Sequence, residues 1–467
     1  MPGGSVTPMS RTVSMRVSSG VARLLKTLSS ATPTYVVGGT MRALFTGEPV
    51  KDLDLVVEDF DRAVEALKEN GFHVSDEAKS FRVVKVFVDG DVVDVAGFRT
   101  ETYDMVSRKP VVAPARSIDE DVSRRDFTIN AIYGRVASVH GDSVELEVVD
   151  RFGGLRDIEG RVVRAVGDPR LRFMEDPLRM LRALRFAVKL GYSVDPVTYN
   201  VIKELHGELR RISRERIRDE LVKMLLADPA RAVMLIYDSG VWHEVMPFLG
   251  AMAGVRHDYR GHHHGETALE HTVETLENLK KLHGLNELNV LAVLLHDIGK
   301  PYTRSEAEGK VMFLGHEDVG AEMARKWLRE MRFPNKTIDL VTKAISLHMK
   351  VHELAKTMSR RAIARFLVEA GEDKDVVELA LEIAEADAGK RYSELREVIG
   401  EMLSMPKLIT GYDLLSYPVE TRKKMLKFVR EIQLAQRITD REKLLKTLKG
   451  LSLPSQKEEK QKQKIRA

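Results

Sequence analysis

The sequence predicts an α/β domain with a small mixed sheet, followed by helical domains to the end of the chain. Short β-branched runs alternate with helical patterns up to about residue 150, and turn residues separate them. From about residue 170 the apolar residues recur at helical spacing instead. The chain has 467 residues, too many for one hydrophobic core, so we expect two to four domains.

The first predicted elements alternate between helix and strand. Asp59 is a suitable N-cap for a helix over 61–70, because its carboxylate accepts hydrogen bonds from the first helical turn. Before it we expect helices over 20–30 and 40–46 and strands over 34–38 and 50–57.

A hairpin and a loop are predicted next. Apolar and polar residues alternate on both sides of Asp89-Gly90, which predicts a β-hairpin over 81–98. The segment 103–123 carries two prolines and mixed charges, and we expect a mobile loop there. The segments 126–133 and 144–149 complete the α/β domain.

Changes in composition divide the chain into six segments. A pattern of Leu, Met and Phe over 171–190 lies among arginines and predicts a helix. The last residues are rich in Lys, Gln and Glu, which is typical of disorder. The predicted segments are a disordered extension over 1–22, an α/β head over 23–158, a helical neck over 159–250, a helical domain over 251–400, a helical tail over 401–454 and a disordered terminus over 455–467.

Composition excludes several kinds of site. The chain has no cysteine, which excludes disulfides and thiolate metal sites, so any metal must be bound by His, Asp or Glu. No apolar run approaches the roughly 20 residues of a membrane helix, so we expect no membrane partner and a cytoplasmic protein. The net charge of +4 is compatible with nucleic-acid binding but does not require it.

Residues 35–57 carry the strongest functional signal. Asp52 and Asp54 lie two apart in an apolar run, and such residues point to the same face of a strand. Two carboxylates repel each other unless a cation lies between them, and Mg²⁺ prefers oxygen ligands. The preceding Gly38-Gly39 allows a tight turn whose N–H groups face an anion. An isolated Asp-x-Asp fits a solvated edge strand better, but the glycines and Arg42 favour chemistry on a nucleoside triphosphate.

Further polar residues extend this pattern. Asp94 is a lone acid in an apolar strand, and a third carboxylate opposite the first two would complete a two-metal site. Arg124 and Arg125 supply guanidinium forks that suit phosphate oxygens, and Asn130 adds an amide. Taken alone, the arginine pair is better explained as a basic surface patch.

Asp176 and Arg179 form a candidate base-reading pair. They are three residues apart on a helix that Glu175 opens, so they share a face. A carboxylate accepts from an exocyclic amine and a guanidinium donates to a ring nitrogen, a combination that cytosine and adenine offer and guanine and uracil do not. The alternative is an intrahelical salt bridge at a helix N-terminus.

Together these motifs resemble the class II nucleotidyltransferase family of the polymerase beta superfamily. That family holds the bacterial-type CCA-adding tRNA nucleotidyltransferases and the poly(A) polymerases. The matching segments keep the family's order, and they are 38–54, 94–103, 124–131, 150–157, 175–186 and 213–225.

The resemblance implies roles for individual residues. Asp52, Asp54 and Asp94 would be catalytic, and the first two would bind Mg²⁺. The implied partners are CTP, ATP and the 3' end of tRNA. One departure is that Ala43 follows Arg42, where the family usually has an acid. The implied nucleotide-binding residues are Gly38, Gly39, Arg42, Arg124, Arg125, Asp126, Asn130, Glu175, Asp176, Arg179, Arg182 and Arg185.

A second set of residues has the spacing of metal ligands. His and carboxylate ligands without cysteine suit Mn, Fe, Ni, Co, Zn or Mg, and metal-bound water can attack a phosphate. Each histidine alone is better explained as structural, but the ordered set over 251–400 resembles the HD phosphohydrolase superfamily, a helical fold. The resemblance implies that a divalent transition metal or Mg²⁺ is bound by His271, His296, Asp297 and Asp387, with His316 and His348 as further ligands.

Three functions fit these motifs. The first is a CCA-adding enzyme with an additional HD phosphohydrolase activity. The second is a poly(A) polymerase, or a relative that adds only CC or only A. The third is a nucleotide-sensing HD hydrolase whose polymerase-like domain is inactive. The paired acids and the Asp176–Arg179 pair argue against the third function. The poor match of 80–84 to the basic motif of poly(A) polymerases argues against a poly(A) polymerase, and the presence of the loop 103–123 argues against a CC-only enzyme, so the sequence favours complete CCA addition.

Overall fold

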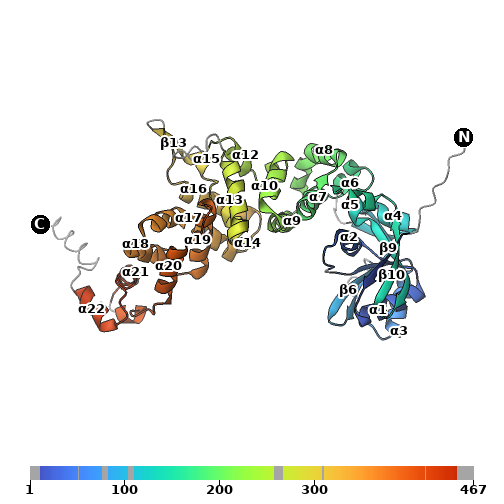
Figure 1. Ribbon diagram of the computed structural model, residues 1–467, viewed down its shortest axis with the longest axis horizontal. Helices are drawn as coiled ribbons and strands as arrows, with labels where there is room; N and C mark the ends of the chain where they lie inside the picture. The colour runs from blue at the N-terminus through green and yellow to red at the C-terminus, as the bar shows by residue number, and fades with distance from the viewer. Residues whose placement is uncertain are drawn as a thin grey trace. The chain divides into compact units, whose positions relative to one another are not determined.

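The computed structural model describes residues 11–50, 52–75, 82–103, 110–256, 267–307, 310–415 and 417–449 (Figure 1). The chain forms two compact units. The first holds the residues up to 224 together with 238–244, and the second holds 225–237 and the residues from 245 onward. We describe each unit by itself.

The first unit is built on an eight-stranded mixed sheet in the order β1-β10-β9-β2-β3-β6-β5-β4, the blue to cyan part of Figure 1. All neighbouring strands are antiparallel except β3 and β6, which run parallel. The strands are β1 Thr12–Arg16, β2 Thr34–Val36, β3 Asp54–Val57, β4 His73–Ser75, β5 Val83–Val88, β6 Asp91–Gly97, β9 Ile132–His140 and β10 Ser143–Asp150. Two smaller pairs are β7 Arg99–Tyr103 with β8 Pro110–Pro114, and β11 Val162–Val163 with β12 Ser193–Val194.

Helices flank this sheet because their apolar residues recur on one face. Leu24, Leu25 and Leu28 of α1 are fully buried, and α1 packs on α3 and β9. The helices are α1 Ser19–Ala31, α2 Gly38–Thr46, α3 Phe60–Glu69, α4 Ile118–Ser123, α5 Gly154–Glu159, α6 Pro169–Glu175, α7 Leu178–Leu190, α8 Pro196–Leu205 and α9 Arg214–Ala227, with 3-10 helices η2 Thr128–Asn130 and η3 His206–Arg211. α9 runs across the boundary at residue 224.

Several sequence predictions are confirmed in this unit. The helix predicted over 20–30 is α1, and Asp59 caps α3 by accepting from the backbone N–H of Arg62 at 3.0 Å. The predicted hairpin is formed by β5 and β6, with Asp89 at φ 52° and Gly90 at φ 90°. Positive φ at both turn residues is the backbone that an Asp-Gly turn favours.

Other predictions are wrong for parts of the chain. Residues 11–22 are not disordered, because β1 pairs with β10 and Ser18 caps α1 by accepting from Val21 N–H. The predicted loop over 103–123 contains β8 and α4. The strand predicted over 50–57 begins only at Asp54. Residues 1–10, 104–109 and the predicted disordered terminus over 455–467 lie outside the described residues.

The helix predicted over 171–190 is two helices, because Asp176 has an extended backbone (φ −140°, ψ 99°) and Pro177 follows it. Asp176 thus ends α6 and α7 begins at Leu178, so the prediction that Asp176 and Arg179 share a face of one helix is wrong.

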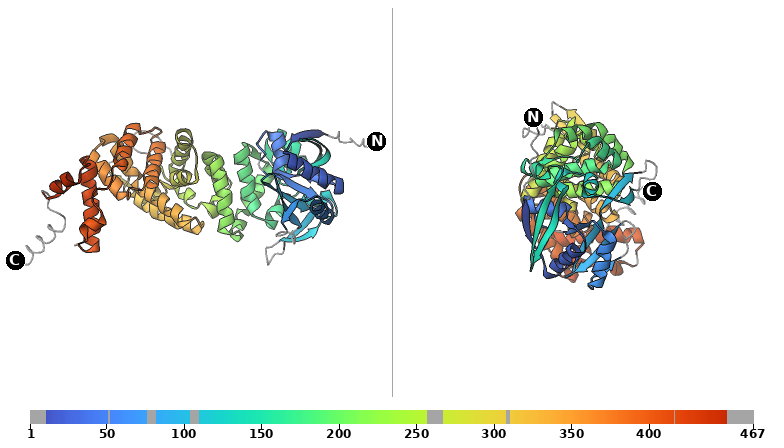
Figure 2. Two further views of the ribbon diagram at one scale, coloured as in Figure 1. Left: turned by 90° about the horizontal axis from the view of Figure 1, so that it is seen from below. Right: turned by 90° about the vertical axis from the view of Figure 1, so that its right-hand side faces the viewer.

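The second unit is helical apart from one short hairpin (Figure 2). α17 packs against α16 and α19, and α14 packs against α17 and α19. Its elements are α10 Pro229–Asp238, α11 Trp242–Val245, α12 Phe248–Ala253, α13 Ala268–Leu282, α14 Glu287–Leu295, α15 Lys300–Thr303, β13 Arg304–Ala307, β14 Lys310–Phe313, α16 His316–Glu330, α17 Asn335–Thr357, α18 Arg360–Glu369, α19 Lys374–Asp387, α20 Ser393–Ser404, η4 Gly411–Leu414, α21 Val419–Ala435 and α22 Arg441–Lys449. α10 and α11 each extend across a boundary between the units.

No described helix combines the length and the apolar character that crossing a membrane requires.

Candidate active site and metal centre

The glycine turn of the head lies where strand β2 passes into helix α2. Gly38 has φ +64°, a left-handed backbone that glycine adopts readily. A Cβ atom at this position would lie 3.6 Å from Asp54 Oδ2 and 3.9 Å from Arg125 Nη1, and one on Gly39 would lie 3.9 Å from Arg42 Nη2. The turn therefore brings the backbone next to one candidate catalytic carboxylate and two guanidinium groups.

Asp54 and Asp94 face each other across the parallel pair β3–β6, since they are partners in the strand register. Asp52 precedes β3, and its backbone carbonyl accepts from Thr40 Oγ1 at 2.6 Å. The expectation that Asp52 and Asp54 share a face within one strand is therefore wrong, although Asp52 is close enough for its charge to raise the pKa of Asp54. Burial, Asp94 and Asp52 raise the pKa of Asp54, while Arg125 opposes them. A bound cation would relieve this repulsion, so the three acids fit Mg²⁺.

Asp121, which the sequence analysis missed, holds the two arginines of this site. It is fully buried, with Oδ1 2.9 Å from Arg124 Nη2 and Oδ2 3.6 Å from Arg125 Nη2. Arg125 also donates to the Tyr133 hydroxyl at 2.9 Å. Burial alone would raise the pKa of Asp121, but Arg124 and Arg125 lower it. The signal in the sequence is the spacing of three and four residues within one helical turn.

A pocket next to these arginines contains the predicted base-reading residues. It is lined by Arg124, Arg125, Asp126, Asp176, Leu178, Arg179, Arg182 and Arg216. Asp176 Oδ2 lies 2.8 Å from Arg216 Nη2, and Asp176 Oδ1 accepts from Leu178 N–H at 3.1 Å. Arg179 donates to Glu175 Oε2 at 3.0 Å and to the carbonyl of Arg124 at 3.1 Å. The structure thus brings the Asp176–Arg179 pair beside the phosphate-binding candidates.

Six predicted nucleotide-binding residues lie outside the lining of this pocket: Gly38, Gly39, Arg42, Asn130, Glu175 and Arg185. Arg42 Nη1 donates to Asn130 Oδ1 at 2.5 Å, and both side chains are buried. Arg185 pairs with Glu220 at 2.5 Å. The direct contact of these residues with nucleotide stays a prediction.

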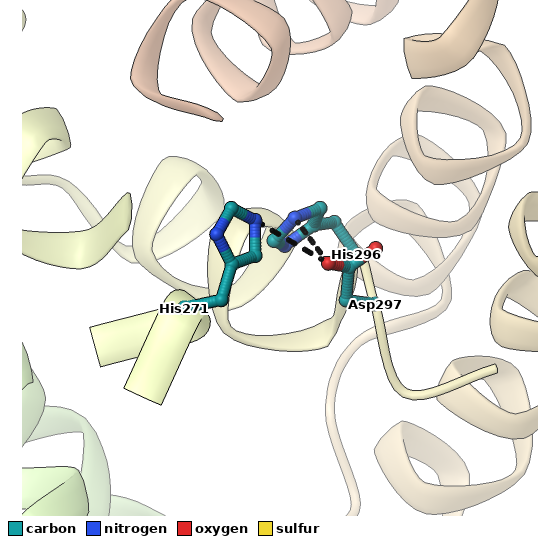
Figure 3. A group of neighbouring side chains, drawn as sticks. All are labelled: His271, His296 and Asp297. Carbon is teal, nitrogen blue, oxygen red and sulfur yellow. Dashed lines mark ion pairs between the residues drawn. The ribbon is translucent and has the colours of Figure 1, made fainter. Parts of the chain in front are cut away.

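The second unit brings the predicted metal ligands together from five separate segments. Asp297 belongs to two groups of ligand atoms that lie within 4.8 Å of one another, one with His271 and His296 and the other with His316 and His348. Figure 3 shows the first group, in which Asp297 Oδ2 is 3.5 Å from His271 Nε2 and 3.2 Å from His296 Nε2. Among the described residues, only these two groups of His, Asp or Glu side chains bring their ligand atoms so close together. As a group, Asp52, Asp54 and Asp94 of the head lie further apart.

Backbone carbonyls orient three of these histidines. The Nδ1 atoms of His296, His316 and His348 lie 2.7, 2.7 and 2.6 Å from the carbonyl oxygens of the residues three positions earlier. An Nδ1–H that donates to a carbonyl leaves Nε2 as the basic nitrogen. Burial, His296 and His316 lower the pKa of His348 to about 3, so it is neutral at physiological pH. Burial alone would lower the pKa of His296, but Asp297 and Asp387 raise it. A neutral imidazole such as His348 beside a carboxylate suits a divalent cation.

Close packing of Gly299 brings His316 to this cluster. A Cβ atom on Gly299 would lie 2.2 Å from the His316 carbonyl oxygen and 2.7 Å from Gly320 N. Only glycine permits this approach of the segment after α14 to the start of α16.

Asp387 lies at the same cluster and bridges two histidines. Its Oδ1 is 2.8 Å from His271 Nε2 and its Oδ2 is 2.8 Å from His352 Nε2. Burial alone would raise the pKa of Asp387, but the two histidines hold it well below its usual range. The sequence analysis missed His352 and also Lys300, whose ammonium contacts Asp297. Both follow a predicted ligand at helical spacing, four after His348 and three after Asp297.

Three family models match successive parts of the chain. Residues 34–164 match the poly A polymerase head domain, 191–252 match the probable RNA and SrmB-binding site of polymerase A, and 268–390 match the HD domain.

Two similar proteins are both named CCA-adding enzyme. The chain is 36% identical over 230 residues to a CCA-adding enzyme of Lactobacillus helveticus, covering 49% of this chain and 55% of that protein. It is 37% identical over 203 residues to the CCA-adding enzyme of Leuconostoc citreum, covering 43% and 48%. The chain thus spans about half the length of the curated relatives it matches.

Solved structures share the fold over nearly the whole chain. The Bacillus stearothermophilus CCA-adding enzyme in complex with CTP has a TM-score of 0.65 at 24% identity, covering 92% of this chain and 97% of that one. The Thermotoga maritima CCA-adding enzyme complexed with tRNA has a TM-score of 0.58 at 21% identity, covering 92% and 94%. The chain therefore has the fold of these CCA-adding enzymes, and parts of it match a poly A polymerase head domain, a probable RNA and SrmB-binding site of polymerase A and an HD domain.

Proposed function

We propose that the chain is a template-independent nucleotidyltransferase that adds or repairs the 3'-terminal CCA of tRNA from CTP and ATP. The observation that carries the proposal is one pocket that joins Arg124 and Arg125 to Asp176 and Arg179, beside the acids that face each other across β3 and β6. The relatives that are named CCA-adding enzymes support it.

The head residues have separate tasks in this reaction. Asp52, Asp54 and Asp94 would hold Mg²⁺, which supplies activation of the attacking hydroxyl and stabilisation of the leaving pyrophosphate. Arg125 lies within reach of the glycine turn and is partly buried in contact with Tyr133 and Asp121. Its fixed guanidinium suits the triphosphate oxygens, because a preorganised cation needs little rearrangement when charge develops.

Base choice would rest on Asp176 and Arg179. The carboxylate accepts from the exocyclic amine of cytosine or adenine, and the guanidinium donates to the adjacent ring nitrogen. Uracil and guanine would present a carbonyl oxygen to the carboxylate of Asp176. Both groups are hydrogen-bond acceptors, so no hydrogen bond could form between them. Arg216 holds one oxygen of Asp176 and so fixes the direction of the carboxylate.

We also propose that the HD domain hydrolyses phosphate esters. His271, His296, Asp297, His316, His348 and Asp387 would hold one or two divalent ions, with Asp297 common to both groups. The bound ion supplies a hydroxide at neutral pH. Lys300 lies beside Asp297 and adds positive charge where a phosphate would approach.

Product length on tRNA tests the main proposal and separates it from its alternatives. The protein is incubated with tRNA that lacks CCA, labelled CTP and ATP. We expect addition of C, C and A and then arrest. A long adenylate tail would identify a poly(A) polymerase, products of one or two nucleotides would identify a partial enzyme, and no extension with intact HD hydrolysis would favour the nucleotide-sensing alternative.

A further inference from the structure

Glu48 lies between the glycine turn of the head and the helix that follows the base-reading residue. One carboxylate oxygen accepts from Arg42 Nε at 3.0 Å, and the other lies 2.7 Å from Lys189 Nζ. Arg42 belongs to α2, which starts with the two glycines, and Lys189 belongs to the last turn of α7. A single side chain thus links the two elements.

The Arg42 guanidinium supports the turn from its buried side. The residue is only 7% exposed. Besides Glu48 and Asn130, its guanidinium lies over the ring of Phe186 at 5.0 Å from the ring centroid. Arg42 Nη2 lies 3.9 Å from the position that a Cβ atom on Gly39 would take, so the guanidinium lies beside the turn.

One face of α7 carries both the base reader and the partner of Glu48. Arg179, Arg182, Phe186 and Lys189 are spaced by three, four and three residues, so they lie on one side of the helix. Arg179 lines the pocket near the start of this face, Phe186 lies beneath Arg42, and Lys189 pairs with Glu48 near its end.

Hydrogen bonds close a ring between the two elements. Arg42 donates to Asn130, whose Nδ2 donates to Asp126 Oδ1 at 3.1 Å, and Arg182 Nη2 donates to Asp126 Oδ2 at 2.6 Å. Arg182 and Lys189 both belong to α7, and Lys189 pairs with Glu48, which closes the ring. Burial alone would raise the pKa of Glu48, but Lys189 and Arg42 lower it, so the carboxylate is ionised at neutral pH.

We propose that Glu48 is a positioning residue that couples the glycine turn to the base-reading helix, and that it supplies the carboxylate that Ala43 does not. The inference rests on the proposed function, because the turn and the helix would contact the triphosphate and the base of one nucleotide. Holding both parts in a fixed relation lets one substrate satisfy both contacts at once.

The test compares Glu48→Gln with Lys189→Met. The first keeps the size of the side chain and removes its charge, and the second removes the partner ammonium. We expect the Kd and KM for CTP and for ATP to rise by about 5- to 20-fold in each variant, with kcat within about 3-fold, since the reacting acids are untouched. The double variant should be no worse than the more affected single one, because both changes break one contact. Lys189→Arg keeps the charge and should restore binding.

A matched control is Glu147→Gln, which removes the same charge from a partly exposed ion pair with Arg135 on the sheet. It should leave Kd and KM unchanged. A folded Glu48→Gln protein with a lower Tm and a wild-type Kd for CTP overturns the proposal, because Glu48 would then be merely structural. Multiplying effects in the double variant overturn it as well.

The outcome also separates this inference from the proposed function. A wild type that binds CTP and ATP but does not extend tRNA refutes nucleotide addition, while the Kd comparison still decides the role of Glu48. A wild type that binds neither nucleotide refutes both.

Discussion

The head and the HD domain hold their candidate metal ligands in different ways. Asp52 and Asp54 have exposed side chains, and partial desolvation together with the nearby Asp94 and Asp52 disfavours the charged form of Asp54. His296 and Asp297 are fully buried, and the ligand atoms around them lie within 4.8 Å of one another. Mg²⁺ bound by few carboxylates completes its shell with water and substrate phosphates, whereas imidazoles and carboxylates can enclose an ion alone. We infer that the head binds metal with its nucleotide and the HD domain binds metal without a substrate.

Removal of the two head acids should have the largest effect. In an Asp52→Ala, Asp54→Ala double variant, incorporation of CMP and AMP into tRNA should fall by about 10³-fold or more, because the metal ligands are lost. The metal content of the purified protein should not change, since the HD ligands are intact. Labelled incorporation and elemental analysis check both points, and retained incorporation would refute the catalytic assignment.

The converse variant should lose only the HD activity. His296→Ala with Asp297→Ala should lower hydrolysis of bis-p-nitrophenyl phosphate by at least about 10²-fold and remove bound metal. Nucleotide addition should stay within about twofold of wild type, which a parallel tRNA assay measures. Loss of addition in a variant with a wild-type circular dichroism spectrum would show that the two sites are not independent.

A smaller effect is expected from the base-reading carboxylate. Asp176→Ala should lower the ratio of kcat/KM for CTP over UTP by roughly 10- to 100-fold, the range for loss of one base-specific contact. The matched control is Asp219→Ala, which removes an exposed carboxylate paired with Arg218 on α9. Equal discrimination in wild type and Asp176→Ala would exclude the base-reading role.

A substitution of Glu385, two residues before Asp387, should affect activity least and should lower stability measurably. Burial would raise the pKa of Glu385, but hydrogen bonds from His283, Arg396 and the backbone of Tyr392 lower it to about 2. Because the folded value lies below the ordinary value of 4.5, this contribution to stability is present above pH 4.5 and is lost as the pH falls toward 2.

Glu385→Gln should therefore lower the free energy of unfolding by about 3 kcal/mol at pH 7. The difference from wild type should shrink as the pH falls below 4.5. Calorimetry at pH 7 and at pH values down to about 3 measures it. A difference that does not change with pH would contradict an ionised Glu385 in the folded protein.

The sequence predicted local chemistry better than tertiary contacts. Asp89-Gly90 and Asp59 predicted a hairpin and a helix cap correctly, because both signals depend on neighbouring residues. The strand β1 was missed, since its partner β10 is more than a hundred residues away and 1–22 carries only a weak pattern. The break at Asp176-Pro177 was hidden by apolar periodicity that continues through both helices.

The sites show the same limit. Ligand types and their order in the chain identified His271, His296, Asp297 and Asp387, which the structure brings together. The residues that pair with the predicted site residues were not identified. Asp121, Arg216 and His352 look in the sequence like ordinary polar positions of a helix, and only the fold brings them to Arg124, Asp176 and Asp387. Glu48 was missed for the same reason, since its partner Lys189 is distant in sequence.

Calorimetric titration of Mn²⁺ into the metal-free protein, with and without a non-hydrolysable CTP analogue, tests the comparison most directly. Without nucleotide, we predict saturable binding that His296→Ala with Asp297→Ala abolishes and Asp52→Ala with Asp54→Ala leaves intact. With the analogue, and after subtraction of the Mn²⁺ that the analogue binds without protein, a second class of sites should appear that only the head variant removes. Nucleotide-free binding that depends on Asp52 and Asp54, or analogue-dependent binding that survives their removal, would contradict the account.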